Sequence, residues 1–279
     1  NRITLRSANT FKVSSILQLS AAVTYSKDND SRGRNSGYNP IQGYYPYARL
    51  ADDKGNALPI YFDYRKPYID TAGHGLLKDW TYRPIDEIGQ EEHQIKNANL
   101  VVNTGANLKL PFGFAFDLKY QYMNQLADQS DLYKTESYYI RDQVNRYAQS
   151  KAGNQFDFPI PEGGMLDAAS SELTSHQGRA QLSFAKNWNS KHSLNALGGY
   201  EIRNQVTTQQ SNRFYGYQPE FGAIAPVVNY TTRYKLYSSD GSATIEARQD
   251  IGKLTDNFLS WFGNAAYTYD NRYTLSASI

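Results

Sequence analysis

A cluster of carboxylates is the first feature of the sequence that could perform chemistry. The stretch DEIGQEE, Asp86–Glu92, is rich in acidic residues, and two carboxyl groups about 5 to 10 Å apart can cleave a glycosidic bond. Nearness in the sequence does not by itself hold two carboxyl groups at that distance across a sugar ring. The chain also lacks a G-x-S-x-G nucleophile elbow and a phosphate-binding glycine loop. We therefore expect no catalytic residues and no enzyme.

Metal-binding patterns are also incomplete. The stretch DNDSRG, Asp28–Gly33, resembles the start of a calcium loop, but Arg32 stands at the fifth position, where a ligand is required, and Asn39 stands where a bidentate Glu belongs. The four histidines show no zinc-site spacing, and the chain has no cysteine. We expect Asp28–Gly33 to be a solvated loop and the protein to hold no metal or cofactor.

Charge and hydropathy exclude two further classes of protein. The net charge is +2 with scattered Lys and Arg, which gives no basic stripe for nucleic acid. A membrane-spanning helix needs a run of about 18 apolar residues, and the sequence contains no such run. The mean hydropathy of −0.67 does not exclude a membrane β-barrel, because only alternate residues of its strands face lipid. The 24 tyrosines suit strands and the polar edge of a bilayer.

Alternating apolar and polar residues predict eight β-strands in four tight hairpins. In the second strand, for example, Leu17, Leu19, Ala21 and Val23 share one face. Most of the strands reach the roughly 9 to 11 residues that a tilted membrane strand needs. The turns are expected at Ser14–Ile16, Pro111–Gly113, Asn189–Lys191 and Asp270–Arg272.

Three long connections separate the hairpins, at about Asp28–His93, Ala127–Leu173 and Thr207–Thr255. Short turns at one end and long loops at the other are typical of an outer-membrane barrel, with periplasmic turns and extracellular loops. A soluble sandwich would spread its loop lengths over both ends. The length asymmetry therefore favours the membrane interpretation.

The faces opposite the apolar stripes indicate a wide barrel. A barrel of about eight strands is filled by its own side chains, whereas one of about 22 strands holds a plug in a wide lumen. The ionisable residues on these faces are too many for a packed narrow interior; they are Arg2, Arg6, Lys12, Asp117, Lys119, Arg179, Glu201 and Arg203. A fragment of a larger barrel is therefore expected.

Six stretches carry a resemblance to a known family. They are YPYARLADDKGNALPI, GLLKDWTYRPIDEI, YYIRDQVNRYAQ, PIPEGGMLD, HSLNALGGYEIRN and SWFGNAAYTYDNRYTLSASI. In this order, with the hairpins between them, they resemble the barrel of the SusC/RagA group of TonB-dependent outer-membrane transporters, typical of Bacteroidota. The resemblance covers nearly the whole chain.

The resemblance implies the fold class: all-β, an antiparallel transmembrane β-barrel, with residues 1–279 forming part of a barrel of about 22 strands with long extracellular loops. It places the plug, the segment that engages TonB and the remaining strands outside these residues. It also implies active import across the outer membrane of a large nutrient, an oligosaccharide or a peptide. The implied partners are a SusD-like surface lipoprotein, TonB through the plug, and outer-membrane lipid.

Aromatic residues in the long connections are the candidates for contact with a substrate or a partner. Rings flanked by polar groups can stack on sugars or peptide side chains, and they dominate protein interfaces. The alternative is that the rings pack the loops against one another. The residues chosen for contact are Tyr45, Tyr47, Trp80, Tyr82, Tyr139, Tyr215 and Tyr217.

Two other functions remain open. A passive outer-membrane channel would have a permanently open lumen and no plug. A soluble binding or adhesive β-protein would be extracted without detergent.

Overall fold

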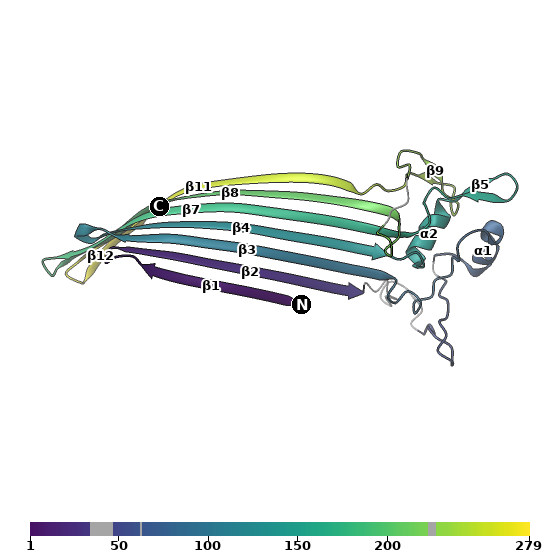
Figure 1. The fold of residues 1–279 in the computed structure, drawn as a ribbon, viewed down its shortest axis with the longest axis horizontal. Coiled ribbons are helices and arrows are strands. Elements are labelled where there is room, and N and C mark those ends of the chain that lie inside the picture. The colour runs from purple at the N-terminus through teal and green to yellow at the C-terminus, as the bar shows by residue number, and fades with distance from the viewer. Residues whose placement is uncertain (34–46, 62, 223–226) are drawn as a thin grey trace.

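The computed structural model describes residues 1–33, 47–61, 63–222 and 227–279. Its main feature is one antiparallel sheet in which eight long strands follow one another in chain order (Figure 1). These strands are β1 (Arg2–Lys12), β2 (Leu17–Gly33), β3 (Glu91–Lys109), β4 (Phe114–Tyr133), β7 (Gly164–Trp188), β8 (His192–Tyr217), β11 (Gln249–Tyr269) and β12 (Tyr273–Ser278). The predicted eight strands in four hairpins are confirmed.

The four tight turns lie where the sequence placed them. The turn between β3 and β4 contains a short 3-10 helix, η3 (Pro111–Gly113). The turns after β7 and β11 contain Asn189–Ser190 and Asp270–Asn271, all at positive φ between 51° and 54°. Asn and Asp tolerate this left-handed conformation better than most residues, so the turn chemistry explains why the strands reverse there.

The register gives the sheet two different faces. One row across the strands reads Phe11, Leu19, Ala106, Leu118, Ala180, Tyr200 and Trp261. The neighbouring row, which points the other way, reads Thr10, Ser20, Gly105, Lys119, Arg179, Glu201 and Ser260. We call these the apolar face and the polar face. The predicted alternation is therefore confirmed across seven strands.

The long strands extend further than the sequence indicated. The strands that flank the connections end at Gly33, Tyr133 and Tyr217 and resume at Glu91, Gly164 and Gln249. The expected boundaries at Asp28, Ala127, Leu173, Thr207 and Thr255 were therefore wrong. Asp28–Gly33 belongs to β2 and pairs with β3, and is therefore not a loop. The error has a physical cause, because near this end of the sheet both faces carry polar residues, and hydrophobic alternation no longer marks a strand.

Small elements fill the three connections. They are α1 (Lys66–Thr71) and η2 (Ala72–Gly75) in the first, α2 (Tyr138–Arg146), β5 (Gln149–Lys151) and β6 (Gln155–Asp157) in the second, and β9 (Tyr234–Lys235) and β10 (Ser242–Ala243) in the third. Figure 1 shows them gathered at the end of the sheet opposite the tight turns. We call the described parts of the three connections the cap. In the described part of the chain, no helix has the length and apolar character needed to cross a membrane.

Candidate functional site

The cap is organised around α2. Ser137 caps its N-terminus, because its hydroxyl accepts a hydrogen bond from the Ile140 amide at 3.3 Å. Both carboxylate oxygens of Glu87, from the first connection, accept from the Tyr138 amide at 2.9 Å. A carboxylate at this position offsets the partial positive charge of a helix N-terminus. Burial is the main cause that raises the pKa of Glu87, and the Tyr138 amide and Arg141 oppose the shift.

The segment around Lys78–Thr81 runs along α2 and is held by side chains of the helix. The fully buried side-chain amide of Asn145 donates to the Lys78 carbonyl at 2.9 Å and accepts from the Lys78 amide at 2.8 Å. Arg141 donates to the carbonyl oxygens of Asp79 and Thr81. These contacts satisfy backbone groups that lie outside any sheet, so the first connection has a fixed path over the helix.

Trp80 joins this segment to an aromatic cluster. Its indole Nε1 donates to Asp142 Oδ1 at 2.9 Å, and the Tyr64 hydroxyl donates to the same oxygen at 3.1 Å. The Trp80 ring lies 4.5 Å from Tyr64, 5.8 Å from Tyr68 and 6.3 Å from Tyr237. Burial raises the pKa of Asp142, against the opposing effect of the Trp80 hydrogen bond. Burial also raises the pKa of Tyr64 to about 12, so its hydroxyl remains a donor at neutral pH.

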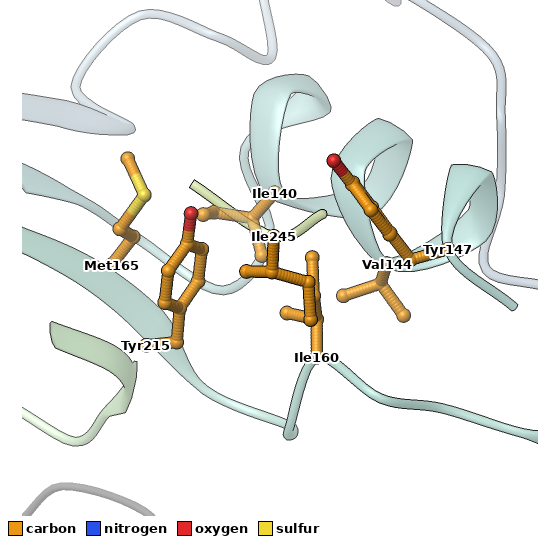
Figure 2. Packing of buried hydrophobic residues seen from close by; sticks show 7 residues of the cluster. All are labelled: Ile140, Val144, Tyr147, Ile160, Met165, Tyr215 and Ile245. Carbon is orange, nitrogen blue, oxygen red and sulfur yellow. The ribbon is translucent and has the colours of Figure 1, made fainter. Parts of the chain in front are cut away.

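A hydrophobic core joins all of this to the sheet. Figure 2 shows its seven side chains, from α2, the two strands β7 and β8 and the later connections. They are Ile140, Val144, Tyr147, Ile160, Met165, Tyr215 and Ile245. Met165 and Tyr215 are paired across β7 and β8 and lie on the polar face, since each is an even number of residues from Arg179 or Glu201. The described part of the cap therefore folds over the polar face, and none of these residues covers the apolar face.

A charge network anchors the third connection next to this core. Arg213 on β8 donates two hydrogen bonds to Asp167 on β7, at 2.6 and 2.7 Å, and one to Glu246 at 2.6 Å. Arg248 also contacts both carboxylates, at 3.1 and 3.2 Å. The Arg213 side chain is only 4% exposed. The bidentate geometry of Arg213 with Asp167 is the strong form of such a pair.

The candidate aromatic residues fall into different environments. Trp80 and Tyr82 are 3% and 5% exposed, and Tyr215 is buried in the core and belongs to β8, not to a loop. Tyr139 is half-buried, 4.9 Å from Tyr133. Tyr217 is half-buried at the end of β8, Tyr47 is 94% exposed, and Tyr45 lies outside the described residues. The buried rings pack the cap, and contact with a substrate or partner stays a prediction for all seven.

The residues that build the cap were missed by sequence reasoning. They are Glu87, Asn145, Asp167 and Arg213. Only α2 left a usable signal, in the stretch SYYIRDQVNR, where a capping Ser precedes Ile140 and Val144 at helical spacing. The long-range pairs have no signature in a single sequence.

The polar face of the sheet carries a hollow that could bind a ligand. A hollow of about 440 Å³ lies around Gly105, with hydroxyl, amide and charged side chains on its walls. Among them, Gln121 donates to Asn103 at 2.8 Å and Gln177 to Glu201 at 2.7 Å. In the part of the chain that the structure describes, no group of three or more His, Asp or Glu side chains could hold a metal ion. The acidic stretch noted above is engaged in structural contacts, since Glu87 binds α2 and Glu92 pairs with Lys134 at 2.7 Å.

Comparison with solved structures shows where this fold occurs. The chain is similar to the RagAB peptide importer in its closed-closed state (TM-score 0.62, 13% identity), in its open-open state (0.62, 14%) and in a further structure of the RagAB peptide transporter (0.63, 13%). In each case 99% of this chain aligns, and it spans 27% of the length of the matched chain. No protein-family model and no curated protein matches the sequence. The likeness confirms the expected fold class, an all-β antiparallel sheet that matches part of such a transporter.

Proposed function

We propose that this chain forms part of the wall of an outer-membrane β-barrel that imports a large nutrient. The observation that carries the proposal is the asymmetry of the sheet: among the described residues, the cap covers one end of the polar face, and the apolar face is exposed. An exposed apolar face of this extent needs a non-aqueous surrounding. In an outer-membrane barrel, the apolar face would contact lipid, the polar face would line a water-filled lumen, and the cap would lie at the cell surface.

The proposed mechanism is the one that the family resemblance implies, and the likeness to solved importer structures supports the import role. A SusD-like lipoprotein would capture the nutrient together with the cap, and TonB would act through a plug to admit it. The fold is shared with a peptide importer, which favours a peptide nutrient over an oligosaccharide. The residues described above would bind and guide the nutrient without catalysing a reaction.

The lipid assignment predicts a large effect for Leu118→Arg. Leu118 is 49% exposed on the apolar face, and an arginine near the bilayer midplane costs about 2 to 4 kcal/mol of barrel stability. The matched control is Gln125→Arg, at an exposed position on the polar face of the same strand, which should leave stability within about 0.5 kcal/mol. Urea titrations of the barrel refolded in lipid vesicles measure both. Equal losses for the two variants would contradict the assignment of the faces.

Import is tested with the intact protein in its own cell. We expect uptake of a labelled oligopeptide to require the protein, its surface lipoprotein and TonB. A tag inserted at Gly55, in the exposed turn held by the Asp52 carboxylate, should be reachable on whole cells. Uptake that persists without TonB would identify a passive channel instead. A tag that is reached only after the outer membrane is opened would invert the topology.

A further inference from the structure

A groove of about 720 Å³ lies on the apolar face, across β4, β7, β8 and β11. Small residues stand beside large ones in this part of the sheet: Gly198 pairs with Leu182, and Ala196 pairs with Phe184. The surface therefore drops between neighbouring side chains. The volume lies in the range of ligand pockets. The aromatic side chains of the apolar face that line the groove are Phe114, Phe116, Phe184, Tyr200 and Trp261.

A cluster of rings lies on the apolar face nearer the cap. The Tyr120 hydroxyl and His176 Nδ1 share a hydrogen bond of 2.8 Å, and the Tyr122 ring lies 5.2 Å from the His176 ring. All three belong to the apolar face, since each is an even number of residues from Leu118 or Ala180. We call them the cap-side belt.

A second cluster of rings lies beside the tight turns. Trp188 stacks on His192 with ring centroids 5.3 Å apart, and His192 Nδ1 lies 2.6 Å from the Tyr267 hydroxyl. The Tyr269 ring lies 5.2 Å from the His192 ring. The register places these four residues on the apolar face as well, and we call them the turn-side belt. Rings with polar edges are typical of the boundary between hydrocarbon and headgroups.

The spacing of the two belts matches the thickness of a membrane. Along β7, His176 and Trp188 are 12 residues apart, which is about 40 Å of strand. A strand tilt of about 40° reduces this to about 30 Å, the thickness of the hydrocarbon layer of a bilayer. Phe184, at one end of the groove, comes four residues before Trp188. The groove therefore lies between the belts and ends near the turn-side belt.

A cation interrupts the apolar face where the groove meets the turn-side belt. Lys186 lies between Phe184 and Trp188 on this face of β7 and is exposed. It forms no ion pair among the residues that the structure describes. A lysine is costly at the bilayer midplane but is tolerated near the headgroups, which its long side chain can reach. Its ammonium group is therefore placed to meet the phosphate of a lipid.

We propose that this groove binds one glycerophospholipid, with an acyl chain along the aromatic side chains and the phosphate at Lys186. The Trp188 indole and the Tyr269 hydroxyl can donate to headgroup oxygens at the same level. Another apolar protein surface would fill the groove but leave Lys186 without a counter-charge. The inference rests on the proposed function in one respect, since the apolar face meets phospholipids only inside a membrane.

Headgroup recognition is tested by native mass spectrometry of the intact protein after detergent has removed the surrounding lipid. Phosphatidylglycerol and phosphatidylcholine with the same acyl chains are offered together. We expect one retained lipid and about a fivefold preference for phosphatidylglycerol, since one lysine attracts its net negative charge. Lys186→Gln should abolish the preference. The matched control is Lys253→Gln, because Lys253 is exposed on the apolar face of β11 and does not line the groove.

The groove itself is tested by filling it. An added Cβ at Gly198 would meet nothing closer than the Phe262 carbonyl oxygen at 3.9 Å, and one at Gly178 nothing closer than Ile202 Cγ2 at 3.5 Å. Leucine should therefore be tolerated at both positions. Gly198→Leu should weaken the binding of both lipids about tenfold. Gly178→Leu is the matched control, since Gly178 lies on the same face but does not line the groove.

Three results would overturn the inference. The first is a wild-type protein that retains no lipid, which would mean that only exchanging membrane lipid covers the groove. The second is a preference for phosphatidylglycerol that persists in Lys186→Gln, or lipid binding that is unchanged in Gly198→Leu. The third is a lipid-free dimer that dissociates in Gly198→Leu, which would make the groove an interface between two copies of the chain.

The outcome is separable from that of the proposed function. Lys186 and Gly198 lie neither in the cap nor on the polar face, so peptide uptake is expected to persist in both variants. If uptake depends on TonB but no lipid is retained, import stands and the lipid site is wrong. If one phospholipid is retained with the expected preference but no uptake occurs, the lipid site stands and the import proposal fails.

Discussion

Replacing Arg213 by alanine is expected to release the third connection from the sheet. The buried guanidinium binds Asp167 and Glu246, and its removal leaves Asp167 without its closest partner. Breaking a buried pair in this way costs about 3 to 5 kcal/mol. We expect the loss of stability to be confined to the cap, because Arg213 joins the third connection to β7 and β8. Most of the backbone hydrogen bonds between the long strands lie outside this contact. Hydrogen exchange of residues 227–248 measures the local opening free energy.

Three comparison variants give the Arg213 prediction its specificity. Arg248 contacts the same two carboxylates, but its side chain is 57% exposed. Arg248→Ala should therefore cost at most about 1 kcal/mol. Arg213→Lys keeps the charge but loses the two parallel hydrogen bonds, and should lie between the two alanine variants. Adding Asp167→Asn to Arg213→Ala should recover part of the loss, because the double variant no longer holds a largely buried carboxylate whose remaining cationic partner is the exposed Arg248. Equal protection of residues 227–248 in the wild type and Arg213→Ala would contradict the anchoring role.

The sheet was predictable from the sequence because its rule is local. Each strand alternates between two environments, so a pattern of period two identifies the strand, its faces and its partners. Phe114, Phe116 and Leu118 all lie on the face that this rule assigns. The rule fails where both faces of a strand are polar, because the alternation then disappears. For that reason the last six residues of β2, Asp28–Gly33, were predicted to be a loop.

The cap was not predictable because its contacts join residues that are far apart in the chain. Asn145 binds the backbone of Lys78, 67 residues away, and Arg213 binds Asp167, 46 residues away. Nothing in the local sequence distinguishes these residues from solvated ones. Counting aromatic residues found the right region but did not separate buried Trp80 from exposed Tyr47. That difference now provides a test of which rings pack the cap and which contact a ligand.

Replacing Trp80 by alanine is expected to open the first connection and, under the proposed function, to abolish nutrient uptake while the proposed barrel still assembles. The indole is buried against Tyr64, Tyr68 and Tyr237 and donates to Asp142. Removing a buried tryptophan typically costs about 3 to 5 kcal/mol. The loss also leaves the buried Asp142 carboxylate with one donor fewer. The strands are unaffected, since Trp80 lies in none of them.

Two matched variants separate packing from contact for these rings. Trp80→Phe keeps an aromatic ring but not the N–H group, so we expect it to lose less cap stability than Trp80→Ala and to retain part of the uptake. Tyr47→Ala removes an exposed ring of the same connection and should change cap stability by less than about 0.5 kcal/mol. If Tyr47 contacts a nutrient or lipoprotein, this variant lowers uptake without opening the cap. The rate of limited proteolysis within residues 63–90 measures how far the cap opens. The heat-sensitive mobility of the protein on gels measures whether the barrel has assembled. A closed cap and normal uptake in Trp80→Ala would contradict the packing role of Trp80. Removal of a buried indole leaves a large cavity, and a close-packed interior is expected to respond to it.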